Sequence, residues 1–238
     1  GKYHTCALLN DDTVKCWGKG DKGQLGDGTS GKGNYKMTPT ATASLGTDAV
    51  QITTGSEHTC ALLDDDTVKC WGYNFFGQLG DGTSGWGNSK NVPTETASLG
   101  AGKTADQIST GDFHTCARLN DETVKCWGRN NYGQLGDADK PNNKNVPPAT
   151  PISLGTDKTA VQISSGGYHT CALLNDGTVK CWGLNISGQL GDGTAGEGTD
   201  RNSPPTTAIS LGDGKTAVQI SAGYNYTCAL LNDGTVKC

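Results

Sequence analysis

The segment HTCALLDDDTVKCWG, residues 58–72, holds two short strand-forming runs on either side of a turn of three aspartates. Closely similar segments begin at His4, His58, His114 and His169, and a fifth begins with tyrosine at Tyr226. Short strand-like runs and glycine-rich turns that recur every 54 to 57 residues are typical of β-propeller blades. The segment therefore predicts a repeat protein built from blades.

One repeat unit is expected to contain four antiparallel strands. In the second copy we expect strands at 49–53, 58–63, 67–71 and 94–99, with a glycine-rich loop at 72–93. No apolar pattern with a helical period persists for three turns. The sequence therefore predicts an all-β fold, a β-propeller of four-stranded antiparallel blades of about 55 residues each.

The blades divide the 238 residues into one repeat domain with incomplete ends. We expect the five blades to cover residues 1–46, 47–103, 104–157, 158–214 and 215–238. The first blade lacks its first strand, and the fifth holds only a start, because the chain begins and stops inside the motif. We therefore expect a partial ring or an excerpt of a longer array.

The ten cysteines fall into five pairs with the same spacing. In each copy a three-residue hairpin loop with a left-handed residue places the two cysteines of a pair opposite each other. Facing residues in such a hairpin lie within disulfide distance. The predicted disulfides are Cys6–Cys16, Cys60–Cys70, Cys116–Cys126, Cys171–Cys181 and Cys228–Cys238. Because no cysteine is left over, the pairs indicate an oxidising compartment.

Each hairpin loop requires one residue with a left-handed backbone. Glycine takes this position in the last two copies, as Gly177 and Gly234. Aspartate, which tolerates the conformation, takes it at Asp12 and Asp66. Glu122 is the least suited of the five, so we expect some strain in the third hairpin.

Asparagines also recur after each Trp-Gly pair. Asn74, Asn130 and Asn185 alternate with Gly20 at this position, which predicts a left-handed backbone there as well. Asn185 and Asn225 each begin an Asn-X-Ser/Thr sequon, so both are possible N-glycosylation sites.

Two metal-binding alternatives compete with these interpretations. One histidine and two cysteines per blade suggest zinc, but a structural site needs four ligands, and Tyr226 replaces the histidine while both cysteines remain. Calcium is the alternative role for aspartates that follow Gly-Gln-Leu-Gly, namely Asp27, Asp81, Asp137 and Asp192. We predict disulfides and side-chain-stabilised turns instead, and therefore no metal and no cofactor.

Composition and motif content argue against several functional classes. His4, His58, His114 and His169 recur in the blades and are expected to be hydrogen-bonded scaffold, and no serine or cysteine is uniquely paired with a histidine. A net charge of −5 provides no basic patch for nucleic acid. No run of about 18 apolar residues is present to span a membrane. We therefore predict a protein that is not an enzyme and binds no nucleic acid.

The repeat resembles that of the regulator-of-chromosome-condensation family. The matching elements, taken from the second copy, are Gly55-x-x-His58, Ala61-Leu62-Leu63, Cys70-Trp71-Gly72 and Gly77-Gln78-Leu79-Gly80. The resemblance covers the whole chain and implies four-stranded blades, usually about seven in a closed ring. The paired cysteines resemble those of a secreted branch of the family. They and the acidic charge favour this branch over the nuclear exchange factor that activates a small GTPase.

Positions that vary between copies indicate where a partner binds. Because successive strands alternate in direction, the turns before each histidine and the long loops after each Trp-Gly share one face. Aromatic and arginine side chains at variable positions are typical interface anchors, although packing between blades is the alternative role for each. The predicted binding residues are Tyr3, Tyr73, Phe75, Phe76, Trp86, Phe113, Arg129, Tyr132, Tyr168, Leu184, Ile186 and Tyr224.

Three functions are compatible with these features. The first is an extracellular, cell-surface or periplasmic recognition module that binds a protein or glycan through this face. The second is a structural repeat protein whose copies assemble into a surface layer, fibre or appendage. The third is an intracellular propeller similar to a guanine-nucleotide exchange factor.

Overall fold

The computed structural model describes all 238 residues and contains strands but no helix, which confirms the all-β prediction. The structure accordingly has no helix of the length and apolarity that a membrane span requires. The first sheet consists of β1 (His4–Leu8), β2 (Val14–Lys19) and β3 (Tyr35–Ala41). The second consists of β4 (Ala49–Thr54), β5 (His58–Leu63), β6 (Val68–Gly72) and β7 (Lys90–Glu95).

The remaining three sheets contain three strands each. The third consists of β8 (Ala105–Thr110), β9 (His114–Leu119) and β10 (Val124–Gly128). The fourth consists of β11 (Ala160–Ser165), β12 (His169–Leu174) and β13 (Val179–Gly183). The fifth consists of β14 (Ala217–Ala222), β15 (Thr227–Leu231) and β16 (Val236–Lys237).

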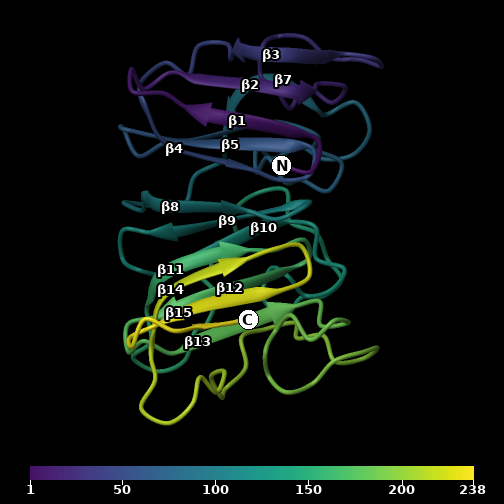
Figure 1. Ribbon diagram of the computed structural model, residues 1–238. Helices are drawn as coiled ribbons and strands as arrows, with labels where there is room; N and C mark the ends of the chain where they lie inside the picture. The colour runs from purple at the N-terminus through teal and green to yellow at the C-terminus, as the bar shows by residue number, and fades with distance from the viewer.

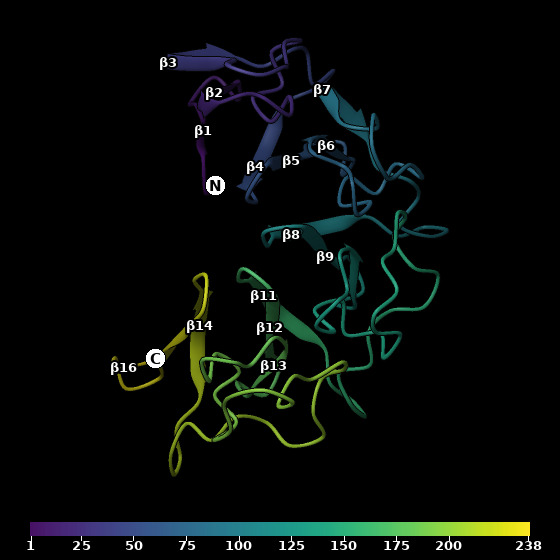
Figure 2. The same ribbon diagram turned by 90° about the vertical axis from the view of Figure 1, so that its right-hand side faces the viewer.

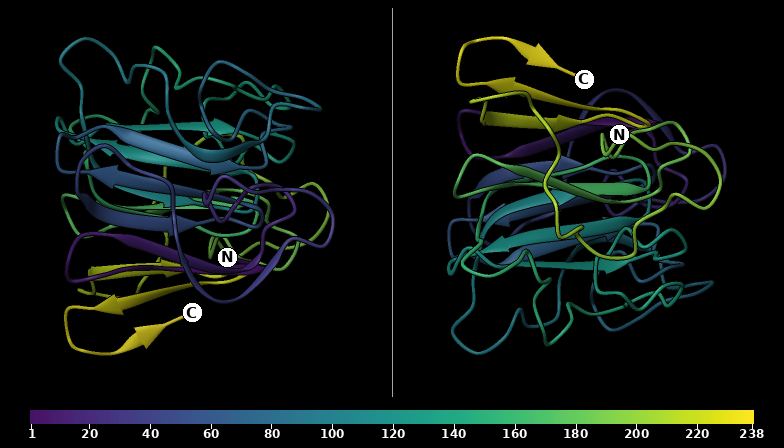
Figure 3. Two further views of the ribbon diagram at one scale, coloured as in Figure 1. Left: turned by 90° about the horizontal axis from the view of Figure 1, so that it is seen from above. Right: turned by 90° about the horizontal axis from the view of Figure 1, so that it is seen from below.

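The five sheets succeed one another in chain order, as the colour gradient of Figure 1 shows. Seen along the axis in Figure 2, they fan out in an open arc, and β4, β8, β11 and β14 lie innermost. Figure 3 shows that the loops collect at the ends of the strands. The sheets are therefore arranged as the blades of a propeller.

A glutamine in β4, β8 and β11 joins each of these inner strands to the next sheet. Gln51 in β4 donates from Nε2 to the carbonyl of Ile108 in β8 at 3.0 Å, and its Oε1 accepts from the amide of Ile108 at 2.9 Å. Gln107 and Gln162 make the same pair of bonds to Ile163 and Ile220. Repeated two-way bonds of this kind fix the spacing of neighbouring sheets around the axis.

The outer strand is the least regular part of each sheet, and its predicted position was wrong. In the second sheet the outer strand begins at Lys90 and not at residue 94. In the third and fourth sheets it consists of a single β-bridge, between Gly128 and Lys144 in one and between Gly183 and Arg201 in the other. Proline pairs follow these bridges, at 147–148 and 204–205. Because proline has no amide hydrogen, it cannot extend the ladder. Fully four-stranded blades are thus not a general property of this chain.

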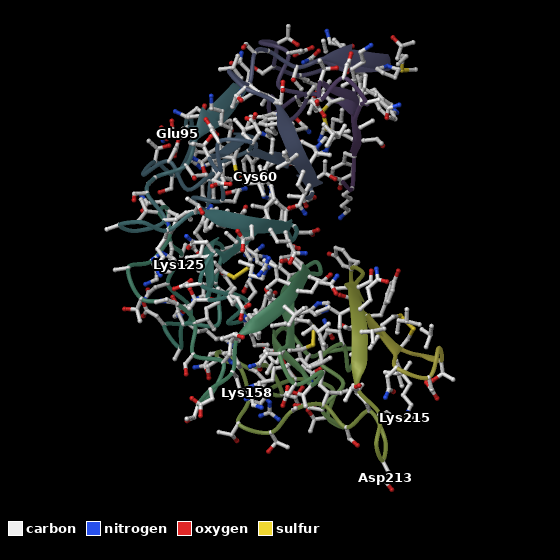
Figure 4. All side chains as sticks on the ribbon, turned by 90° about the vertical axis from the view of Figure 1, so that its left-hand side faces the viewer. Cys60, Glu95, Lys125, Lys158, Asp213 and Lys215 are labelled. Atoms are coloured by element: carbon white, nitrogen blue, oxygen red, sulfur yellow. A yellow bond between two sulfur atoms is a disulfide. The ribbon has the colours of Figure 1, made fainter.

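The hairpin that carries the cysteines has the predicted register. Cys60 in β5 lies opposite Cys70 in β6, and the other copies repeat this pairing. All five predicted disulfides are present, with Cα–Cα distances of 4.0 to 4.1 Å, and no cysteine is free. Figure 4 shows Cys60 inside the second sheet and Glu95 at its outer edge. Each disulfide therefore cross-links the hairpin of its sheet.

The left-handed positions of the hairpins are also confirmed. The backbone φ angle is +59° at Asp12, +64° at Asp66 and +62° at Glu122, and glycine takes the position at Gly177 and Gly234. The Glu122 carboxylate accepts a hydrogen bond of 2.6 Å from the Thr159 hydroxyl. This bond holds the side chain of the residue least suited to the conformation.

The predicted left-handed conformation of Asn74, Asn130 and Asn185 is wrong, because none of them has a positive φ angle. Their side chains are fully buried and organise the long loop from within. The Oδ1 atom of Asn74 accepts from the Leu79 amide at 3.0 Å, and its Nδ2 donates to Asp81 at 3.0 Å. Asparagine is thus used here for its side chain and not for its backbone.

Gly20 shows why asparagine alternates with glycine at this position. In the first copy the side chain of Asn34 enters the loop instead, where its Nδ2 donates to the carbonyl of Gly20 and to the hydroxyl of Thr29. A Cβ atom on Gly20 would lie 2.6 Å from that nitrogen. Glycine therefore makes room for an asparagine supplied from elsewhere in the chain.

The aspartates after Gly-Gln-Leu-Gly stabilise their turns, as predicted. Asp81 Oδ1 accepts from the backbone amide of Thr83 at 2.9 Å and from its hydroxyl at 2.6 Å. Asp27 and Asp192 bond their threonines in the same way, and Asp137 accepts from the amide two residues later. These carboxylates are therefore committed to their own loops.

A buried link of four residues joins the first four sheets in succession, and three of its residues recur between the fourth and fifth sheets. Between the second and third sheets, Thr115 Oγ1 donates to the Gln78 carbonyl at 2.8 Å, and Trp127 Nε1 donates to the same oxygen at 3.1 Å. His58 Nε2 lies 3.1 Å from the threonine hydroxyl. Because that hydroxyl has already given its only hydrogen to Gln78, His58 must donate from Nε2. The predicted hydrogen-bonded scaffold role of the histidines is confirmed.

Replacing Trp127 by alanine is expected to lower the free energy of unfolding by about 3–5 kcal/mol. Trp127 is fully buried in a core cluster with Leu79, Ile108 and Leu119, so the variant loses apolar contacts as well as the bond to Gln78. Trp86→Ala is the matched control, because Trp86 is 78% exposed and its loss should change stability by less than about 0.5 kcal/mol. Chemical denaturation followed by circular dichroism measures both variants. Equal losses would contradict this difference.

Candidate functional site

Two kinds of connection meet at one rim of the arc, which we call the variable rim. It consists of the turns before each histidine, such as residues 55–57, and the long loops after each Trp-Gly, such as residues 73–89. Phe113, in the turn between β8 and β9, has its ring centroid 6.0 Å from that of Tyr73 and 5.4 Å from that of Phe76, in the loop after β6. Side chains of neighbouring sheets therefore contact one another on this rim.

Eight rings on the variable rim form one continuous set of contacts, which we call the aromatic cluster. Its members are Tyr73, Phe75, Phe76, Trp86, Phe113, Tyr132, Tyr168 and Tyr224. Centroid distances between contacting rings range from 5.0 to 6.3 Å, and most pairs are edge-to-face or tilted, the arrangements that aromatic rings prefer. The cluster extends from the loop of the second sheet to the turn of the fifth.

Exposure differs across the aromatic cluster. Trp86 is 78% exposed and Tyr224 is 47% exposed, whereas the six rings between them are half-buried. Trp86 stands at the tip of its loop between two glycines with positive φ angles, Gly85 and Gly87. The half-buried rings thus pack between sheets and still reach the surface, so packing and contact with a partner are compatible roles.

The remaining predicted apolar residues lie beside the aromatic cluster. Lys2 Nζ lies 5.4 Å from the ring centroid of Tyr3 and 5.5 Å from that of Tyr224, so it connects the first and fifth sheets at this rim. Leu184 is half-buried and Ile186 is 55% exposed, and both follow β13. Neither aliphatic residue belongs to the aromatic cluster.

Arg129 lies in the middle of the aromatic cluster. Its guanidinium carbon is 4.8 Å from the ring centroid of Phe76 and 5.3 Å from that of Tyr168. The rings of Phe113 and Tyr132 are each 5.9 Å away. A guanidinium surrounded by four aromatic faces and edges is held by cation–π attraction and loses part of its hydration.

Sequence reasoning missed the lysines of this rim. Lys19 Nζ lies 4.9 Å from the Tyr3 ring centroid and pairs with Glu57 at 2.9 Å, and Lys22 Nζ lies 5.3 Å from the Tyr73 ring centroid. The signal was present in the repeat, because Lys19 occupies the position of Tyr73 and Arg129 in later copies. The predicted binding residues are aromatic residues, arginine and two aliphatic residues, and they include no lysine.

A cavity of about 350 Å³ opens next to the aromatic cluster, where the inner strands end. It is lined by small and polar residues, among them Thr54, Thr110 and Ser165. Asp112 also lines it and is 7% exposed, and this burial raises the pKa of its carboxyl. Burial also raises the pKa of nearby Tyr168 to about 12, so the phenol is neutral at physiological pH.

The sequon at Asn185 is not accessible in the folded chain. Asn185 is fully buried, and its Nδ2 atom, which would carry a glycan, donates to Thr194 Oγ1 at 2.9 Å and to Asp192 at 3.3 Å. A glycan on this nitrogen is incompatible with the folded loop, so this predicted site is corrected. Asn225 is half-buried in the turn before Tyr226 and remains a predicted site.

The variable rim is made mainly of aromatic and cationic side chains, and the recurring histidines are not part of it. The histidines are buried between sheets, and burial lowers the pKa of His58 and of His114 to about 3, so both rings are neutral. No group of three or more histidine, cysteine, aspartate or glutamate side chains is placed to hold a metal ion. What the rim does present is a continuous aromatic surface with cations set into it.

The antiparallel sheets are arranged around an axis, recurring buried polar bonds link them, and their variable residues lie on one rim. These features define a propeller of the protein-interaction type. The chain belongs to the RCC1-like domain family, whose pattern matches residues 1–238. The resemblance seen in the repeat motifs is thereby confirmed.

Individual relatives agree with this assignment. The chain is 32% identical over 238 residues to the ultraviolet-B receptor UVR8 of Arabidopsis thaliana. This match covers 99% of the chain and 51% of the receptor. Human WBSCR16 has a similar structure, with a TM-score of 0.84 and 24% identity over 99% of this chain and 59% of that one. Yeast RCC1, solved bound to Kap60, also has a similar structure, with a TM-score of 0.81 and 25% sequence identity. The match covers 99% of this chain and 53% of yeast RCC1. The chain thus spans at most about half the length of the curated relatives it matches.

Proposed function

We propose that this chain is an extracellular recognition module that binds a protein partner through the variable rim and has no catalytic activity of its own. The aromatic cluster is the observation that carries the proposal. It presents large rings with few rotatable bonds around a central arginine, which is the composition of binding hot spots. RCC1-like propellers are protein-interaction modules, and yeast RCC1 has been solved bound to Kap60.

The cysteines support the extracellular compartment of this proposal. Disulfides persist in oxidising surroundings and are rare where cellular reductants keep thiols reduced. Five bridges with no free cysteine support a life outside the cytosol. The exposed Trp86 supports a binding role in that setting, because a ring that is 78% exposed contributes little to folding.

Simultaneous replacement of Phe75 and Phe76 by alanine is expected to weaken partner binding by about 30-fold or more, as loss of an interface hot spot does. Defined ligands come from a random peptide display library selected on the oxidised chain. Tyr35→Ala with Met37→Ala is the matched control, because these side chains are 58% and 91% exposed on β3, at the outer edge of the first sheet. Calorimetry measures each affinity. Unchanged binding by the Phe75 and Phe76 variant would contradict the proposed site.

A glycan is the second candidate ligand, and one groove favours it. A hollow of about 200 Å³ on the variable rim is lined by Trp86 and Tyr73 together with polar Asp21, Ser30 and Asn91. Aromatic rings beside hydrogen-bonding groups suit the mixed apolar and polar faces of a sugar. Binding to a glycan array that Trp86→Ala abolishes, together with no selectable peptide, would favour this candidate over a protein.

A further inference from the structure

Arg129 is the one arginine of the chain without an acidic partner. The other two are paired, Arg118 with Asp106 at 3.3 Å and Arg201 with Asp192 at 2.8 Å. The Arg129 side chain donates to no protein group, and its Nε atom is buried without a partner. A buried donor that makes no hydrogen bond is costly, and native structures usually satisfy such groups. Arg129 therefore has unused binding capacity.

The surrounding rings fix the orientation of the Arg129 guanidinium. Phe76, Phe113, Tyr132 and Tyr168 hold the guanidinium from several sides. The side chain as a whole is half-buried, and only its Nε is a buried atom without a partner, so the two terminal nitrogens face solvent. A planar guanidinium with both terminal nitrogens free matches a carboxylate in a two-point ion pair. The aromatic walls lower the local dielectric and so strengthen such a pair.

The charges around Arg129 favour an acidic ligand. Lys2 and Lys22 lie over rings of the same rim and make no salt bridge, and Glu57 is already paired with Lys19. The charges of Lys2 and Arg129 act on the nearby Asp112 carboxylate, but neither cation forms a salt bridge with it. The variable rim thus carries unpaired cations on a chain whose net charge is −5.

We propose that the variable rim binds an acidic protein segment, and that Arg129 holds one aspartate or glutamate carboxylate of that segment in a bidentate ion pair between the aromatic rings. The inference rests on the proposed protein-binding function and names the chemistry of its central contact. The aromatic cluster supplies apolar contact on both sides of the carboxylate, and Lys2 and Lys22 lie where further acidic residues of the segment would pass.

Peptides from the same display library test this contact. Each selected peptide is resynthesised with its aspartates changed to asparagine and its glutamates to glutamine, and both forms are titrated against four proteins by calorimetry. The proteins are the unaltered chain, Arg129→Gln, Arg129→Lys and Arg201→Gln. The last is the matched control, because it removes the same charge from an arginine that is already paired with Asp192.

We expect the amide forms to bind the unaltered chain and Arg201→Gln about 10- to 100-fold more weakly than the acidic forms, the range for loss of a desolvated charge pair. On Arg129→Gln most of this difference should disappear, and what remains is the contribution of Lys2 and Lys22. Arg129→Lys keeps the charge but loses the two-point geometry, so it should restore only part of the difference. If Arg129→Gln misfolds, it would lose binding of both forms, and circular dichroism would show the misfolding. The comparison of Arg129→Lys with the unaltered chain would then decide whether Arg129 holds the carboxylate.

Other outcomes overturn the inference in distinguishable ways. Equal binding of acidic and amide forms to the unaltered chain would exclude a carboxylate anchor. An acid preference that keeps its full size in Arg129→Gln would assign the anchor to another cation. If either result occurs while Phe75→Ala with Phe76→Ala still abolishes binding, the proposed function stands and the role of Arg129 falls. If peptides bind that double variant as well as the unaltered chain, both proposals fall.

Discussion

Reduction of the five disulfides is expected to unfold this chain at neutral pH and room temperature. Each bridge joins residues ten positions apart, and closing a loop of this length stabilises the folded state by roughly 3 kcal/mol in the chain-entropy model. Five such contributions equal or exceed the roughly 5–15 kcal/mol by which a typical domain is stable. Only 33% of the residues are hydrophobic, so apolar burial leaves little reserve.

The measurement compares thermal unfolding by circular dichroism with and without a phosphine reductant, after mass spectrometry has shown that all ten cysteines are paired. Two double variants provide the control. Cys116→Ala with Cys126→Ala removes a fully buried bridge, whereas Cys228→Ala with Cys238→Ala removes one at the exposed edge of the fifth sheet, and both open a loop of the same length. The buried pair should cost more, because its sulfurs also pack in the core.

Retention of the native melting temperature by the fully reduced chain would contradict this expectation. It would also remove the physical reason to place the chain in an oxidising compartment, because the bridges would then be dispensable. A graded loss, in which each removed bridge lowers the melting temperature separately, would indicate that neighbouring sheets unfold in part independently, as in other repeat proteins.

The hairpins were predictable because their constraints are local. The spacing of Cys60 and Cys70, together with a three-residue loop, leaves one register that places both sulfurs opposite each other. The same loop explains the left-handed backbone of Asp66 and Glu122. Such features depend on residues within about ten positions, where turn geometry is decisive.

The errors concern residues whose surroundings come from distant parts of the chain. The outer strand β7 begins at Lys90 because it is set by its pairing with β6 across a long loop, and its own sequence has weak strand preference and includes Pro93. Asn74 and Gly20 alternate because Asn34, at the far end of the same loop as Gly20, fills the first loop with its side chain. Neither relation leaves a periodic signal in the sequence.

The aromatic cluster falls between these cases. Strand alternation assigned its residues to one face, and the structure does bring them together, from Trp86 at one end to Tyr224 at the other. Alternation could not show that four rings surround Arg129, because that depends on the angle between neighbouring sheets. The sequence thus predicted which residues share a surface but not which of them lies at its centre.

Acidification from pH 7 to pH 5 is expected to destabilise the chain by several kcal/mol. Burial lowers the pKa of His4, His58 and His114 to about 3 and that of His169 to about 4, against an ordinary value of 6.5. Below pH 6.5 the unfolded chain therefore binds protons that the folded chain does not, so stability is complete above that pH and is lost as the pH falls toward the folded pKa. At pH 5 this corresponds to about 2 kcal/mol per histidine.

Carboxylates do not account for a loss in this range. Hydrogen bonds from Lys103 and Thr123 lower the pKa of Asp121 to about 2, so its contribution is lost only below its ordinary pKa of 3.8. Asp112 acts in the opposite sense, because burial raises its pKa and protonation relieves the cost of burying its charge. The four histidines therefore dominate between pH 7 and pH 5.

Urea unfolding of the oxidised chain at several pH values gives the slope of stability against pH, which counts the protons taken up on unfolding. Replacing His58 and His114 by glutamine keeps a donor for Thr115 and Thr170 but removes two titrating groups, so the slope between pH 5 and pH 6 should fall to about half. Asp121→Asn, the control, should leave that slope unchanged. A free energy of unfolding that does not change from pH 7 to pH 5 would mean that the histidine rings can be protonated in the folded chain. The assignment of a neutral histidine that donates to threonine in each link between sheets would then be wrong.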